Sequence, residues 1–148
     1  MQLSKNFELR EFVPKEIFNN WGTRALRFID PKLPIIAQGV KEYFNGRLVT
    51  INNWAYGGSR NYSGFRPYDC LVGAKQSQHK SGRAIDLIVK GIKSEDVYKE
   101  IIDSQQYFVT LGVTAIEENT NGWTHLSCEW TDKTDIMVIT NKKKGDGK

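Results

Sequence analysis

The segment from Ala84 to Val89, Ala-Ile-Asp-Leu-Ile-Val, constrains the fold of this chain more than any other. It is apolar and β-branched, which is typical of a buried strand, and Asp86 alone interrupts it. Because the side chains of a strand alternate between two faces, Asp86 shares its face with Ala84 and Ile88. Burying a carboxylate is costly unless it is paired or bound to a metal. The fold must therefore bring a partner for Asp86 to this strand.

The rest of the chain predicts helices in the first part and mainly strands in the last third. Apolar residues at helical spacing, with Asp30-Pro31 and Ser94 as start signals, predict helices over residues 14–22, 31–46 and 94–104. Strands are expected over residues 48–54, 84–89, 112–118, 123–130 and 135–140, the last three as a meander. We therefore expect one α+β domain over residues 1–140, with a small antiparallel sheet flanked by helices.

The positive charge is concentrated at the end of the chain. The 148 residues carry a net charge of +4, but residues 141–148 contain four Lys and one Asp. The preceding residues are almost neutral, so we expect a basic, disordered tail and no nucleic-acid partner for the folded body. A protein that binds nucleic acid through this tail is the rival interpretation. No apolar run approaches the roughly 18 residues of a membrane span, so no membrane association is expected.

The two histidines of the chain are the strongest functional lead. His79 lies in a long loop rich in Gly, Ser, Asn and Pro, and Gly82 permits a tight turn into the strand that carries Asp86. With His125 from a neighbouring strand, two imidazoles and one carboxylate form a ligand set typical of catalytic zinc with an open fourth position. The alternative is that both histidines are ordinary loop or core residues.

Motifs around these residues resemble one known family. Ser-x-His-x-x-Gly-x-Ala-x-Asp at residues 77–86 is similar to the signature of the zinc D-Ala-D-Ala peptidases. These enzymes have the Hedgehog/DD-peptidase fold and include many phage endolysins. Ser63-Gly-Phe-Arg66-Pro and Trp123-Thr-His125 are similar to two further family segments, and residues 7–12 resemble the start of its compact single-domain branch. The resemblance extends from about Phe7 to Trp130.

The resemblance implies both an activity and the residues that perform it. It implies a zinc ion (Zn2+) bound by His79, Asp86 and His125, and peptidoglycan stem or cross-link peptides as substrates. The family's upstream arginine contacts substrate, so we expect Arg66 to bind substrate and to stabilise the oxyanion. Ser77 is expected either to bind substrate or to cap the loop before His79. Trp123 is expected either to form a wall of the cleft or to pack in the core.

The general base is where this chain departs from the family pattern. Many members carry an acid just before the third ligand, but residues 121–124 contain none, and the nearest acids upstream are Glu117 and Glu118. An even number of residues in the hairpin turn would point Glu118 toward the metal, and an odd number would reverse this. We expect an even turn, and hence Glu118 as the catalytic base. The same alternation places Cys128 on the face opposite His125, in the core.

Together these features predict a zinc metallopeptidase that degrades the cell wall. Residues 1–6 lack the apolar segment of a signal peptide, so we expect no export signal and synthesis in the cytoplasm. As a phage protein it would reach the wall through a holin or as a virion component, as a monomer or beside other virion proteins. The alternative is an inactive zinc-binding domain that recognises the wall or has a structural role in the virion.

Overall fold

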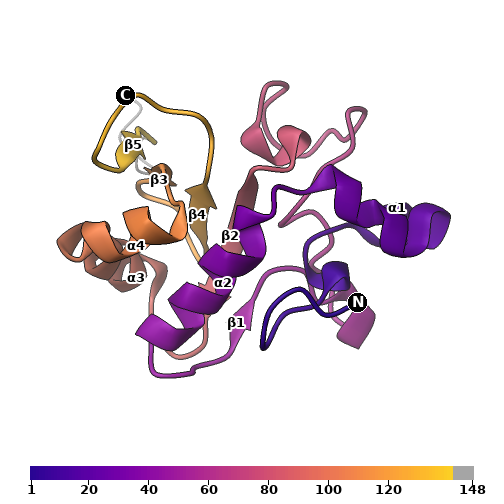
Figure 1. Cartoon of the computed structure of the whole chain (residues 1–148), viewed down its shortest axis with the longest axis horizontal. Helices are drawn as coiled ribbons and strands as arrows, with labels where there is room; N and C mark the ends of the chain where they lie inside the picture. The colour runs from indigo at the N-terminus through magenta and orange to yellow at the C-terminus, as the bar shows by residue number, and fades with distance from the viewer. Residues whose placement is uncertain (142–148) are drawn as a thin grey trace.

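The chain forms an α+β structure, shown in Figure 1 as a computed structural model that describes residues 1–141. Within that range, the α-helices are α1 (Lys15–Trp21), α2 (Lys32–Tyr43), α3 (Ser94–Asp103) and α4 (Gln105–Leu111). The strands are β1 (Val49–Thr50), β2 (Ala84–Val89), β3 (Ala115–Glu117), β4 (Thr124–Ser127) and β5 (Met137–Ile139). Short 3-10 helices connect them, named η1 (Leu9–Glu11), η2 (Gly22–Phe28), η3 (Trp54–Tyr56) and η4 (Gln78–Ser81). The predicted basic tail lies, from residue 142 onward, outside the described residues.

The sheet is mixed, which corrects the expectation of an antiparallel sheet ending in a meander. Its strand order is β1-β2-β4-β3-β5, and β5 pairs with β3 in parallel. The reason is that β2 and β3 occupy both edges of β4. The chain leaving β4 therefore cannot pair with β4 itself and adds its strand at the free edge of β3, where its direction makes the pair parallel.

One face of the sheet forms the hydrophobic core. Ile85 and Leu87 of β2, Ile116 of β3 and Leu126 of β4 have no exposed surface and belong to one cluster of buried residues. Helix α2 lies across the strands in Figure 1 and buries the apolar side chains Leu33, Ile36, Ala37 and Val40 in the same cluster. Burying one such large aliphatic side chain contributes roughly 1.5–3 kcal/mol, so this face stabilises the fold.

The long segment between β1 and β2 is fixed to the sheet by buried polar groups. The Asn52 side chain, 1% exposed, accepts a hydrogen bond from the Ser63 N–H at 2.8 Å and donates one to the Val13 carbonyl at 3.2 Å. Arg60 donates to the Asp86 carbonyl at 3.0 Å, and the Asp86 N–H donates to the Ser63 carbonyl at 2.7 Å. These bonds hold an irregular segment beside β2 at Asp86, the carboxylate on this otherwise apolar strand.

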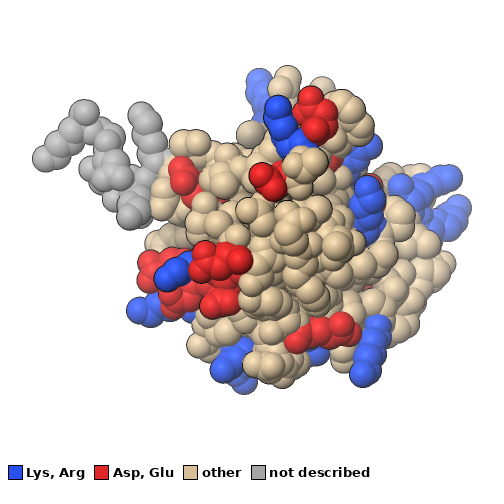
Figure 2. Space-filling model, turned by 60° about the vertical axis from the view of Figure 1, so that its left-hand side comes forward, with Lys and Arg blue, Asp and Glu red and all other residues tan. Residues whose placement is uncertain are grey.

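On the face in Figure 2, Lys and Arg side chains of the described residues are interspersed with Asp and Glu and separated by uncharged surface. This distribution differs from the continuous basic stripe that follows a nucleic-acid backbone. Among residues 1–141, no helix has the length and apolar character needed to cross a membrane.

Candidate metal centre

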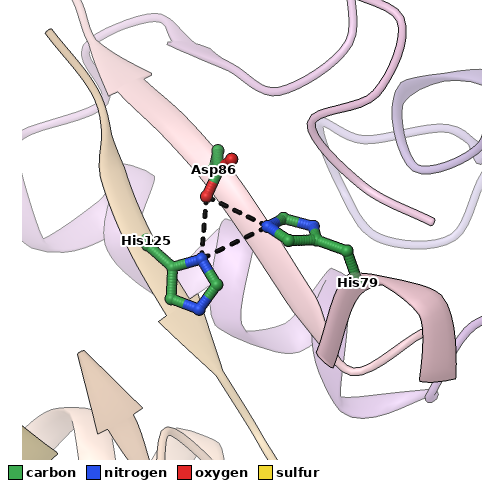
Figure 3. Close-up of side chains that lie close together, drawn as sticks. All are labelled: His79, Asp86 and His125. Atoms are coloured by element: carbon green, nitrogen blue, oxygen red, sulfur yellow. Dashed lines mark hydrogen bonds and ion pairs between the residues drawn. The ribbon is translucent and has the colours of Figure 1, made fainter. Parts of the chain in front are cut away.

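Three side chains from separate parts of the chain meet on the face of the sheet away from α2 (Figure 3). Asp86 of β2 and His125 of β4 are directly opposite each other in the antiparallel pair, and His79 reaches them from η4. The Asp86 Oδ1 atom is 3.2 Å from His79 Nε2 and 2.9 Å from His125 Nδ1. The two imidazole nitrogens are 3.2 Å apart. The structure thus brings together the three residues that the sequence singled out.

Local backbone geometry fixes the position of His79. The Ser77 hydroxyl oxygen accepts a hydrogen bond from the His79 N–H at 3.2 Å, which caps η4. Gly82 follows η4 with a φ of 69°, and a Cβ at this position would lie 1.8 Å from the Phe28 carbonyl oxygen. Only glycine combines this conformation with so close an approach. Ser77 and Gly82 are therefore needed to turn the chain from His79 into β2.

The second ring nitrogen of His79 sets the tautomer of the imidazole. Nδ1 lies 2.8 Å from the carbonyl oxygen of Gly64, which can only accept a hydrogen bond. In the neutral ring, Nδ1 therefore carries the proton and Nε2 presents its lone pair to Asp86 and His125. A metal-binding histidine almost always has such a partner for its other nitrogen.

The two carboxylate oxygens of Asp86 have different partners. Oδ1 faces both imidazoles, and Oδ2 is 3.1 Å from an Nη atom of Arg66 in a largely buried ion pair. Burial by itself would raise the pKa of Asp86. The neighbouring rings of His125 and His79, which donate hydrogen bonds and positive charge to Oδ1 when they are protonated, outweigh burial and hold the pKa of this carboxyl well below its ordinary value. Asp86 is therefore an ionised group with one oxygen directed at the imidazoles.

The spacing of these atoms fits a single metal ion. In a tetrahedral site with bonds of about 2.0–2.1 Å, ligand atoms are about 3.3 Å from one another. The three separations here are 2.9–3.2 Å, so an ion at their centre requires only a slight expansion. His79, Asp86 and His125 are the group among residues 1–141 that could hold a metal ion. They are positioned to bind one.

His79, Asp86 and His125, the candidate metal-binding group, lie in the wall of an open cavity of about 610 Å³. Arg66, Ser77 and Trp123, the predicted substrate-binding residues, all line this cavity. The Ser77 hydroxyl also caps η4, so both of its expected roles are compatible with its position. Trp123 lies two residues before His125 and shares its face of the sheet. The cavity therefore presents the ligand group together with polar and aromatic side chains.

The register of the β3/β4 hairpin shows that the predicted position of Glu118 is wrong. Ile116 lies opposite Leu126, and the same register brings Glu117 opposite His125. Glu117 lines the cavity of the metal centre, whereas Glu118 lines a separate hollow beside α3. Of these two acids, Glu117 faces the candidate metal-binding group and Glu118 does not.

The hairpin turn explains this reversal. The observed register requires an odd number of residues in the turn, which is the case that points Glu117 inward. Asn119 and Gly122 have φ values of 56° and 98°, in the left-handed region. Ser94, at the start of α3, accepts a hydrogen bond from the Gly122 N–H and donates one to the Thr120 carbonyl, both at 3.2 Å. A long-range contact with α3 thus stabilises a turn that local sequence did not indicate.

The guanidinium of Arg66 has a role that the sequence did not reveal. It is 8% exposed, donates from Nε to the Tyr62 carbonyl at 2.7 Å, and pairs with Asp86. Its residue also lines the cavity. Arg66 therefore helps to orient Asp86 through the carboxylate oxygen that does not face the imidazoles.

Glu129 is a cavity residue that the sequence analysis missed. It lines the cavity and its Oε1 accepts a hydrogen bond from the Ser127 hydroxyl at 2.9 Å. Alternation along β4 could have found it, because His125, Ser127 and Glu129 fall on the same face of an extended strand. By the same rule Cys128 was expected in the core, and it is 4% exposed there, as predicted.

Comparisons of this chain with protein-family models, curated proteins and solved structures return no match. Function is therefore inferred from the residues of this chain and from its sequence motifs.

Proposed function

We propose that the protein is a zinc-dependent metallopeptidase of the D-Ala-D-Ala peptidase type that hydrolyses peptidoglycan stem or cross-link peptides. The convergence of His79, Asp86 and His125 in a cavity that also presents Glu117 carries this proposal. Two imidazole nitrogens and one carboxylate oxygen are a donor set that suits zinc. Three protein ligands leave a coordination position for the reaction, whereas structural zinc sites have four.

The residues around the ligand group supply the rest of a hydrolytic mechanism. Bound zinc would act as a Lewis acid that polarises the substrate carbonyl and makes water a stronger nucleophile. Glu117 lies opposite His125 across the strand pair, where side chains are about 4.5–5.5 Å apart at Cβ. Its carboxylate takes a proton from the attacking water and returns it to the nitrogen of the breaking peptide bond. The Arg66 guanidinium keeps Asp86 oriented and can donate to the oxygen that gains negative charge.

The local structure supports the resemblance to the D-Ala-D-Ala peptidases and their Hedgehog/DD-peptidase fold. Four of the five specified motif positions have a physical reason here. Ser77 caps the turn, and Gly82 permits the close approach to Phe28. His79 and Asp86 are members of the ligand group. A mixed sheet with the ligand group on one face and helices on the other is compatible with that fold. The phage setting, with release by a holin or incorporation in a virion, is part of the same proposal.

The position of Glu117 favours an enzyme over an inactive wall-recognition or virion domain. That alternative was motivated by the absence of an acid just before His125 in the sequence. Glu117 supplies an acid from the neighbouring strand, at the register position directly opposite His125.

Hydrolysis of purified peptidoglycan by zinc-loaded protein tests this function. We expect the wild type to release new amino groups, and Glu117→Gln to lower the rate by about 10²–10⁴-fold while one equivalent of zinc remains bound. Glu118→Gln is the matched control, because Glu118 lines a different hollow, and it should retain the wild-type rate. Zinc binding by the wild type without any cleavage would instead favour the recognition domain.

A further inference from the structure

Glu129 is a third carboxylate in the cavity, after Asp86 and Glu117, and it takes no part in the proposed hydrolysis. It lies four residues after His125 and two residues beyond the end of β4. The residue lines the same cavity as the three predicted ligands. An acid at this position needs an explanation, because it adds negative charge to a cleft that already contains Asp86 and Glu117.

Two hydroxyl groups hold Glu129 in a defined position. The fully buried Ser127 donates from Oγ to Glu129 Oε1 at 2.9 Å, and Thr114 Oγ1 donates to the Glu129 backbone carbonyl at 2.7 Å. Because Ser127 shares the face of His125, its hydrogen bond draws the carboxylate back along β4 toward the metal centre. The Ser127 hydroxyl that holds the carboxylate is two strand residues from His125, a span of about 6.6–6.8 Å, which corresponds to roughly two residues of an extended substrate.

Among residues 1–141, Glu129 forms no ion pair with a Lys, Arg or His side chain. Arg66, the cation of the cavity wall, is already paired with Asp86. Lys32 and Arg83 line the hollow on the other side of Glu129, and neither forms an ion pair with it among residues 1–141. The Ser127 hydrogen bond engages Oε1, and within residues 1–141 Oε2 forms no hydrogen bond.

We propose that Glu129 binds a protonated amino group of the substrate and selects peptides with a free amine within about two residues of the cleaved bond. An ammonium offers charge-assisted N–H donors, which match a carboxylate that is fixed in position and not neutralised by the protein. The side-chain amine of a diamino acid and a free amino terminus share this chemistry. The inference rests on the proposed peptidase function and adds the chemical class of its substrate.

The test uses one synthetic stem pentapeptide that contains lysine, in three forms. One form has both amines free, one is acetylated on the lysine side chain, and one is acetylated at the amino terminus. Equilibrium binding of each form is measured with zinc-loaded protein in the Glu117→Gln background, where turnover is slow. Glu129→Gln is compared there with Glu118→Gln, which changes an acid outside this cavity. Hydrolysis of the same peptides by the wild type is measured in parallel.

We expect one of the two acetylations to weaken binding by roughly 10- to 100-fold, which identifies the amine that Glu129 contacts. Glu129→Gln should weaken binding of the free peptide by a similar factor and remove the difference between the free and acetylated peptides, and Glu118→Gln should do neither.

The proposal is overturned if Glu129→Gln distinguishes the free and acetylated peptides as well as its parent does. It is also overturned if Glu129→Gln weakens binding of all three peptides equally, or if no peptide binds. Cleavage without discrimination also rejects it and leaves the peptidase function intact. Discrimination that depends on Glu129, without cleavage, supports the amine site and rejects the peptidase function.

Discussion

The two faces of the central sheet use the same strands for different purposes. On one face, residues such as Ile85 and Leu126 are fully buried in the core cluster to which α2 also contributes, and they stabilise the fold. On the other face, their sequence neighbours Asp86 and His125 belong to the group that is positioned to bind a metal ion. Strand alternation alone separates the two sets, so adjacent residues of β4 should affect either stability or chemistry, but not both.

Replacing His125 with alanine should have the largest effect on the cavity face. With only His79 and Asp86 remaining, we expect less than one-tenth of an equivalent of zinc per chain, against about one for the wild type. Elemental analysis after gel filtration measures this directly. A His125→Ala or His79→Ala protein that kept its full zinc content would overturn the site assignment.

Replacing Leu126, the next residue, with alanine should affect the other face. The fully buried side chain leaves a cavity in the core, so we expect the free energy of unfolding to fall by about 2–5 kcal/mol. Denaturant titration of the zinc-free protein measures the loss. The folded variant should still bind one equivalent of zinc, and loss of zinc by the folded protein would mean that the two faces are coupled.

Replacing Arg66 with glutamine should have a smaller effect, because Arg66 touches a ligand and not the ion. Without its ion pair, Asp86 is less firmly oriented, so we expect zinc affinity to fall by about 10–100-fold. Competition with a chelator of known affinity gives the value. The exposed Arg27, replaced in the same way, is the control and should leave the affinity unchanged. An effect of Arg66→Gln no larger than that control would remove Arg66 from the site.

The smallest expected effect is a difference in chemical reactivity between the thiols of Cys70 and Cys128. Cys128 is buried on the core side of the sheet, and burial, with a further contribution from Asp30, raises its pKa to about 11. Cys70 is only partly buried. At pH 8 we expect iodoacetamide to modify Cys70 and to reach Cys128 only after unfolding, as peptide mass spectrometry would show. Equal labelling of both would mean that the core face opens in the native protein.

Regular elements were predictable because their signals are local. Helices α1, α2 and α3 lie within residues 14–22, 31–46 and 94–104, and β2 has the predicted bounds. The ligand group was predictable because a buried carboxylate needs a partner, and the two histidines of the chain lie in motifs that resemble known zinc ligands. Helix α4 was not expected, and β1 is shorter than the predicted strand.

Features that depend on distant contacts were not predictable. Glu117 rather than Glu118 faces the cavity because Ser94 of α3 stabilises an odd turn that contains Asn119 in the left-handed conformation. The parallel pairing of β5 follows from β2 occupying an edge of β4, which no local pattern indicates. The ion pair of Arg66 with Asp86 joins residues twenty positions apart through an irregular loop.

Mass spectrometry of peptidoglycan fragments tests the central claim most directly, because it reports activity, metal dependence and the cleaved bond together. Purified peptidoglycan is digested with zinc-loaded protein, with protein treated with a chelator, and with chelator-treated protein to which zinc is restored. We expect new peptide fragments with the first and third samples and none with the second. Identical fragment patterns in all three samples would contradict this expectation.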